Sequence, residues 1–316
     1  MNSLTHSLHK HGKLLLTGEY FVLDGALALA VPTQLGQRFT FEVDPAAANA
    51  VFSWKSVDVQ GNTWFRGLFH REDLTLLNSI AEPVGLRLMK IFNTIKRMNP
   101  NFVGFQSIEN ITSNLEFPNE WGLGTSSTLI AALAEWADVS AYELLQETFG
   151  GSGYDLACAN AERSILYQIH QGAGQYVEIP YMPPYQEGLY FIYLGKKQNS
   201  RAGIQRFRAK GQAPKSILNK INQLSLAWLQ AADLQMLDQI ILQHEAIVSG
   251  YLGLEKVKDL YFQNYWGAVK SLGAWGGDFV LATSNRSPEE TKGYFQQKGF
   301  NTIFSYQDLI FAQPNS

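Results

Sequence analysis

A run of glycine and hydroxyl side chains, from Gly122 to Ser127, comes directly before a stretch rich in alanine and leucine. Backbone N–H groups at the start of a helix, together with the positive end of its dipole, favour a bound phosphate. Hydroxyls such as those of Thr125 and Ser126 can cap the helix or ligate Mg²⁺. A plain turn with an N-cap explains the run equally well. No lysine follows the glycines, so this is not a Walker A loop.

Two further glycine-rich segments each end in an aspartate. The first, residues 150–155, delivers the carboxylate of Asp155 to the start of a predicted helix. A carboxylate there could accept a hydroxyl proton or face a metal and phosphates, although the segment alone is more typical of an acid that complements the helix dipole. The second, residues 273–278, runs into an apolar stretch and on its own indicates a tight turn.

Charged residues stand at the ends of two predicted strands. Lys13 precedes a short apolar strand and Glu19 follows it, which could place opposite charges in one cleft. Lys197 and Arg201 follow a strand that ends near Leu194 and could hold an acceptor phosphate or carboxylate. In both cases the alternative is a set of solvated charges, which is the usual state of such residues.

The elements that position these residues alternate between strands and helices, which indicates an α/β or α+β protein. Strands are predicted at residues 13–16, 38–43, 188–194 and 279–282, with two short strands within 102–115. Helices are predicted at residues 74–98, 125–137, 142–148, 155–167, 216–248 and 288–298. The prolines within 179–184 suit a connection between domains, which gives predicted domains of residues 1–180 and 181–316.

Composition narrows the class of protein. The 316 residues are 46% hydrophobic with a net charge of −3, enough apolar content for full cores and no basic block for nucleic acid. No apolar run reaches the length of a membrane span and no secretory signal is apparent at the start. The single cysteine, Cys158, cannot form an internal disulfide. These features predict a cytoplasmic protein with neither a nucleic-acid nor a membrane partner.

Taken together, four segments resemble the GHMP kinase superfamily, which is named for galactokinase, homoserine kinase, mevalonate kinase and phosphomevalonate kinase. The superfamily pattern opens with a P-G-K strand followed by G-E and continues with P-x-x-x-G-L-G-S-S. A glycine-rich segment with a catalytic aspartate follows, and G-A-G-G-G closes the pattern before a C-terminal strand. The matching segments occur here in the same order at residues 12–20, 118–127, 150–155 and 273–278.

The resemblance implies a fold and a division of labour. The fold would be α+β, a two-domain α/β sandwich with an N-terminal domain similar to ribosomal protein S5 domain 2 and a ferredoxin-like C-terminal domain. The N-terminal domain would carry the ATP-phosphate loop and the catalytic aspartate, and the C-terminal domain would contribute to the acceptor site. The protein would be a monomer or a homodimer that binds ATP, Mg²⁺ and a small-molecule acceptor.

By the same resemblance, residues of this chain take up roles in phosphoryl transfer. Asp155 matches the residue that takes the proton of the acceptor, and Lys13 matches the lysine that stabilises charge beside it. Ser126 matches the magnesium-binding serine. The ATP phosphates would lie along Gly122, Leu123, Gly124, Thr125, Ser126 and Ser127. The acceptor would lie near Glu19, Tyr20, Lys197, Arg201, Gly276, Gly277 and Asp278.

Local matches are similar to phosphomevalonate kinases, which favours phosphomevalonate or mevalonate as the acceptor. They are Gly18-Glu19-Tyr20, the segment 151–157, and Gly276-Gly277-Asp278. The sequence departs from the superfamily pattern at His11, Trp121 and Trp275, and the two bulky rings could reshape the acceptor pocket. A sugar kinase, an ATP-dependent decarboxylase of the mevalonate branch and a non-catalytic binding protein on the same fold stay open.

Overall fold

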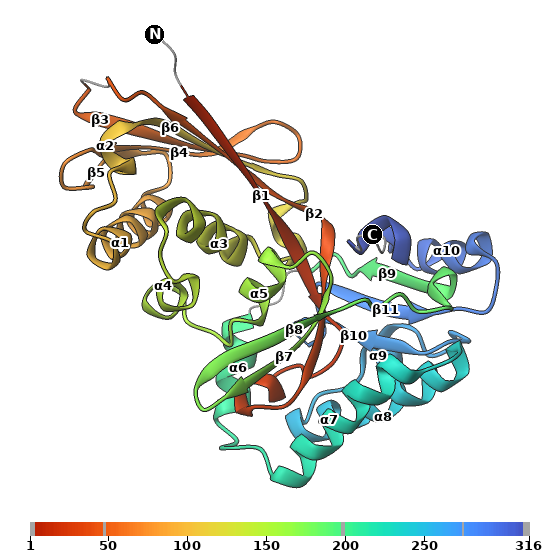
Figure 1. The fold of residues 1–316 in the computed structure, drawn as a ribbon. Helices are drawn as coiled ribbons and strands as arrows, with labels where there is room; N and C mark the ends of the chain where they lie inside the picture. Colours follow the sequence, from red (N-terminus) through yellow and green to blue (C-terminus); the bar gives the residue numbers. More distant parts are fainter. Residues whose placement is uncertain (1–3, 47–48, 197–199, 274, 312–316) are drawn as a thin grey trace. The chain divides into compact units, whose positions relative to one another are not determined.

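The computed structural model describes residues 4–46, 49–196, 200–273 and 275–311 (Figure 1). The chain forms two compact units that interleave along the sequence. Unit 1 comprises Met1–Gly12, Leu35–Asn119 and Gly124–Asn160, and unit 2 comprises Lys13–Gln34, Glu120–Leu123 and Ala161–Ser316. The domain boundary predicted between residues 180 and 181 falls inside unit 2 and does not separate the two compact units. The division into domains at that point stays a prediction.

Unit 1 is a sheet covered by helices. Its strand order is β5-β4-β3-β6-β2, with β3 and β6 parallel and the other neighbours antiparallel. The strands are β3 (Val51–Val57), β4 (Thr63–His70), β5 (Leu76–Ser79), β6 (Ile108–Leu115) and the second part of β2 (Ala28–Val43). The helices are α1 (Glu82–Met98), α2 (Gly104–Ser107), α3 (Thr125–Ala137), α4 (Ala141–Thr148) and α5 (Tyr154–Asn160).

The core of unit 1 follows from strand alternation. In β3, Phe52, Trp54 and Ser56 point inward and are buried, while their neighbours in sequence are half-buried. Figure 1 shows α1, α3 and α4 gathered on one side of this sheet. Their apolar residues pack with those of the strands into one cluster that includes Phe92 and Leu133.

Unit 2 contains an antiparallel sheet of order β10-β11-β9-β12. Its strands are β9 (Leu189–Tyr193), β10 (Val269–Ser271), β11 (Phe279–Thr283) and β12 (Ile303–Ser305). The hairpin of β7 (Ser164–His170) and β8 (Ala173–Ile179) pairs with the first part of β2. β1 (Leu4–Leu15), like β2, contributes residues to both units.

Helices α7 (Lys215–Gln230) and α8 (Leu234–Leu252) run side by side in unit 2 (Figure 1). The other helical segments of the unit are η1 (Phe21–Asp24), η3 (Gln186–Gly188), α6 (Ser200–Arg208), α9 (Val257–Tyr261), α10 (Pro288–Gln297) and α11 (Tyr306–Leu309). A short turn, η2 (Asn119–Trp121), precedes the glycine run. Among the described residues, no helix combines the length and the apolar character needed to cross a membrane.

Four predicted elements are wrong in detail. The helix predicted at 74–98 begins only at Glu82 as α1, because residues 76–79 form β5, which pairs with β4. Residues 102–115 form one helical turn and a single strand, α2 and β6, instead of two strands. The helix predicted at 155–167 ends at Asn160, and β7 begins at Ser164 because it pairs with β2 and β8. The helix predicted at 216–248 is two helices, since Asp233 caps α8 by accepting a hydrogen bond from the N–H of Met236.

Candidate active site

The start of α3 offers unfilled hydrogen-bond donors. Its N-cap is Gly124, with φ of 97°, and no side chain that the structure describes caps the helix. The N–H groups of Thr125 and Ser126 donate to none of the described residues. The Ser127 hydroxyl is buried at 1% exposure, and within the same described ranges it has no partner. Donors left open at a helix N-terminus suit an anion, so these residues fit a bound phosphate.

Lys13 and Asp278 both lie close to Gly122 in unit 2. The Nζ of Lys13 donates to the carbonyl of Gly122 at 3.0 Å, and its backbone N–H donates to the carbonyl of Leu123 at 3.0 Å. A Cβ added at Gly122 would lie 2.5 Å from Oδ2 of Asp278, and its φ is 69°, so both space and conformation require glycine there. The tertiary structure thus brings together residues from the first, second and fourth motifs.

Asp155 opens α5 in unit 1. Gly150, Gly151 and Gly153 precede it with φ of 71°, 114° and 85°, a path that only glycine follows without strain. The half-buried carboxylate accepts a hydrogen bond from the N–H of Leu156 through Oδ1, at 3.2 Å. Within the described ranges no donor reaches Oδ2. One carboxylate oxygen is thereby oriented, and the other is available to accept a proton or hydrogen bond.

Glu19 was expected to line the acceptor cleft, but its side chain is buried at 1% exposure. It forms an ion pair with Lys270 of β10, and its Oε2 lies 3.3 Å from Nε2 of His244 in α8. A carboxylate enclosed in this way is not presented to a ligand. This burial favours an indirect role for Glu19.

Tyr20 holds a conformation that is uncommon for a non-glycine residue, with φ of 61°. Its hydroxyl accepts a hydrogen bond from the N–H of Trp275 at 3.0 Å. Burial raises the pKa of this hydroxyl above its usual value. Tyr20, the residue before η1, therefore ties the connection between β1 and η1 to the last glycine motif, where Gly276 and Gly277 follow Trp275.

The remaining predicted acceptor residues are described only in part. Lys197 and the side chain of Arg201 lie outside the described residues, although Arg201 itself lies in α6. Trp275 packs into an apolar cluster with Phe21 and Phe207, and its Nε1 donates to the carbonyl of Glu255 at 2.9 Å. The two tryptophans that depart from the superfamily pattern both pack internally, since Trp121 contacts the rings of Tyr193, Phe279 and Phe304.

Sequence reasoning missed the ionisable residues that surround Glu19. His244, Glu245 and Lys270 are each at most 1% exposed. Burial raises the pKa of Glu245 to about 8 and lowers that of His244 well below 6.5. The available sign was Lys270 between apolar residues of the stretch 268–272, since a buried lysine needs a partner.

No protein-family profile matches the sequence, and no curated protein matches it. Solved structures do. Mevalonate kinase of L. major, in complex with R-mevalonate, is 17% identical with a TM-score of 0.68, and the match covers 99% of this chain and 98% of that one. Phosphomevalonate kinase of Streptococcus pneumoniae, in complex with phosphomevalonate and AMPPNP, is 17% identical with a TM-score of 0.68. That match covers 95% of this chain and 99% of the other.

Galactokinase of Lactococcus lactis, complexed with galactose, is 10% identical with a TM-score of 0.67, covering 98% of this chain and 94% of that one. The three structures bear names from the superfamily that the four sequence motifs resemble. At these identities the likeness establishes the fold and leaves the substrate open. The chain therefore has the two-domain α+β fold of the GHMP kinases.

Proposed function

We propose that this protein is an ATP-dependent small-molecule kinase. The observation that carries the proposal is the start of α3, where two backbone N–H groups and a buried hydroxyl have no hydrogen-bond partner among the described residues. Such donors match the phosphates of a nucleotide. The complex of a similar fold with AMPPNP supports the same ligand class.

The proposed reaction joins an acceptor hydroxyl to the γ-phosphoryl group of ATP. The acceptor oxygen forms a bond to phosphorus, the bond from phosphorus to the oxygen of ADP breaks, and the acceptor proton leaves to a base. Asp155 is assigned as that base, or as the group that orients the hydroxyl, and Lys13 as a stabiliser of negative charge. Because phosphoryl transfer depends mainly on positioning and charge stabilisation, these few groups are sufficient.

Mg²⁺ would neutralise charge on the phosphates, and Ser126 is the residue assigned to hold it. No cluster of three or more His, Cys, Asp or Glu side chains suited to a metal ion occurs in the part of the chain that the structure describes. This fits an ion that is bound jointly with the nucleotide, because Mg²⁺ keeps several waters and substrate phosphates as ligands.

Nucleotide binding is the first expectation to test. Wild-type protein should bind ATP in the presence of Mg²⁺, measured by calorimetry, and Ser126→Ala should weaken binding by about tenfold or more, as for loss of a hydrogen bond to a charged group. Ser140→Ala, which removes the cap of α4, is a matched control and should bind ATP normally. Equal affinities for wild type and Ser126→Ala would contradict the assignment of Ser126.

The acceptor is proposed to be phosphomevalonate or mevalonate. The three local matches to phosphomevalonate kinases and the two mevalonate-type structures support it. A sugar kinase is the second candidate, supported by the likeness to galactokinase. ADP release should be measured with ATP and phosphomevalonate, mevalonate, galactose, a heptose phosphate or homoserine. Turnover of a sugar with neither mevalonate compound active would refute the acceptor and leave the kinase proposal standing.

A further inference from the structure

Four ionisable side chains form an enclosed cluster in unit 2: Glu19, His244, Glu245 and Lys270. Lys270 forms an ion pair with Glu19, and its Nζ lies 3.9 Å from Oε1 of Glu245. Glu245 also accepts hydrogen bonds from the N–H and the hydroxyl of Ser271, both at 3.2 Å. Removing charged groups from water costs free energy, and the attraction between the paired charges often does no more than offset that cost. A buried cluster of this kind is therefore expected to add little to the stability of the fold. A role in positioning accounts for it better.

The cluster holds the connection between β1 and η1 from two sides. The N–H of Gly18 donates to Nε2 of His244 at 3.1 Å, so that nitrogen carries no proton and the neutral ring has its proton on Nδ1. Lys270 in β10 binds the next residue, Glu19. Helix α8 and strand β10 thereby fix two successive residues of one short segment.

Tyr20 passes this constraint to the last glycine motif. Its backbone has the unfavourable φ of 61°, which persists only where surrounding contacts enforce it. Its ring stacks on Phe207 with centroids 6.0 Å apart, and its hydroxyl binds the N–H of Trp275. A Cβ on Gly203 of α6 would lie 2.5 Å from the same hydroxyl, so α6 also approaches it closely.

We infer that Lys270 and His244 are positioning residues: they fix Gly18–Tyr20, and Tyr20 in turn fixes the loop that carries Asp278 and the nearby helix α6. This inference rests on the proposed kinase function, since that loop and that helix contain most of the residues assigned to the acceptor. Loss of the cluster should weaken acceptor binding more than it weakens ATP binding, since only Asp278 of that loop lies against Gly122 of the glycine-rich run.

The test uses the full chain and two independent variants. Glu19→Gln/Lys270→Met replaces both partners of the ion pair, so no unpaired charge stays buried, and His244→Leu removes the acceptor of the Gly18 N–H. His244→Gln keeps an acceptor and should restore function. Lys258→Met is the matched control, because Lys258 donates to the carbonyl of Gly267 outside the cluster.

Both cluster variants should raise the acceptor KM by about tenfold to a hundredfold, the scale expected for misplaced binding groups, and this rise should exceed any change in ATP affinity. Hydrogen exchange, which needs no activity, should become faster in peptides spanning residues 17–23 and 271–279. A folded variant with unchanged KM and unchanged exchange would overturn the inference. If wild type turns over no acceptor, the proposed function fails, and the exchange rates alone decide whether the cluster positions these segments.

Discussion

Asp155→Asn is expected to lower kcat by about 10²–10⁴-fold, the usual contribution of general acid–base catalysis. Asparagine keeps the shape of the side chain, and its oxygen still accepts the hydrogen bond from the N–H of Leu156, which lies 3.2 Å from Oδ1 in the wild type. It cannot take the proton of an acceptor hydroxyl. ATP affinity should change little, because the proposed phosphate site lies at the start of α3. The measurements are kcat with the active acceptor and ATP affinity by calorimetry.

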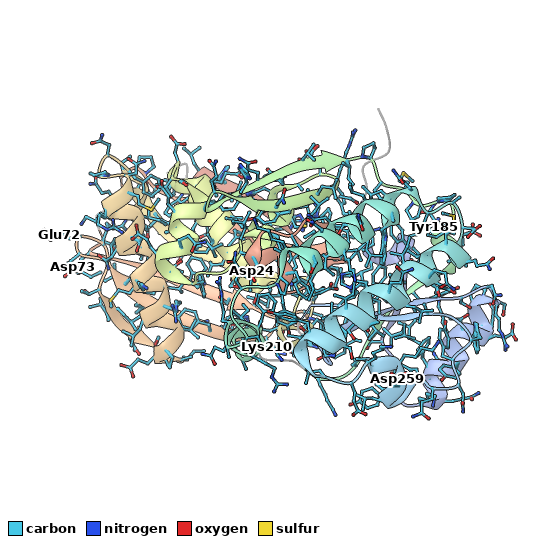
Figure 2. The ribbon with its side chains drawn as sticks, turned by 90° about the horizontal axis from the view of Figure 1, so that it is seen from below. Asp24, Glu72, Asp73, Tyr185, Lys210 and Asp259 are labelled. Carbon is cyan, nitrogen blue, oxygen red and sulfur yellow. The ribbon has the colours of Figure 1, made fainter. Side chains whose placement is uncertain are left out.

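A purely structural Asp155 would give the opposite pattern. Loss of an acid that complements a helix dipole costs about 0.3–1 kcal/mol of stability and leaves the chemistry intact. Asp259→Asn is the matched control, since Asp259 is an exposed acid in the first turn of the short helix α9 (Figure 2). Near-normal kcat with a lowered thermal midpoint for Asp155→Asn, as in the control, would show that Asp155 is structural.

The second large effect is a fall in stability between pH 6.5 and 8. Burial raises the pKa of Glu245 from 4.5 to about 8, so between these values the folded protein holds a proton that the unfolded chain has released. The free energy of unfolding therefore falls as the pH rises through this window. From pH 6.5 to 8 the loss should be about 2 kcal/mol, since each pKa unit corresponds to about 1.4 kcal/mol.

The pKa shifts of Glu19 and His244 explain why the pH range of 6.5 to 8 is the one to measure. Burial also raises the pKa of Glu19, although Lys270 opposes the shift, so Glu19 acts in the same direction as Glu245. The pKa of His244 is lowered well below 6.5, so its contribution to stability is lost only as the pH falls below 6.5. Above pH 6.5 its ring is mostly neutral in both states, and the raised pKa values of the two carboxyl groups give the slope its direction.

Denaturant unfolding across this pH range measures the effect. Glu245→Gln removes the titrating group, while its amide oxygen can still accept from the N–H of Ser271 and its NH2 group can donate to the Ser271 hydroxyl, so its stability should depend less on pH than that of the wild type. Glu135→Gln, a change at a half-exposed carboxylate paired with Lys10 in unit 1, should keep the wild-type slope. A flat wild-type profile, or an unchanged slope in Glu245→Gln, would show that Glu245 does not hold this proton.

Local sequence determined the elements whose stability depends on their own residues. The helix predicted at 125–137 is α3, Thr125–Ala137, because alanine and leucine favour helix and no glycine or proline interrupts them. The helix predicted at 288–298 is α10, where Pro288 starts the helix and Ser287 with Glu290 forms a capping box. The glycines before Asp155 and at Gly124 likewise indicated flexible backbone from their residue type alone, and they adopt positive φ.

Only the tertiary structure decided features that depend on distant partners. β7 is a strand because it pairs with residues 28–30 of β2, which lie more than 130 residues before their partners, so its own pattern could not separate it from the preceding helix. Lys270 and Glu19 are 251 residues apart, and the sequence of neither indicates its partner. Residue types and spacing thus determined the glycine-rich loop and the candidate base. Packing decided that Glu19 is enclosed, because burial and pairing depend on how segments far apart in sequence come together.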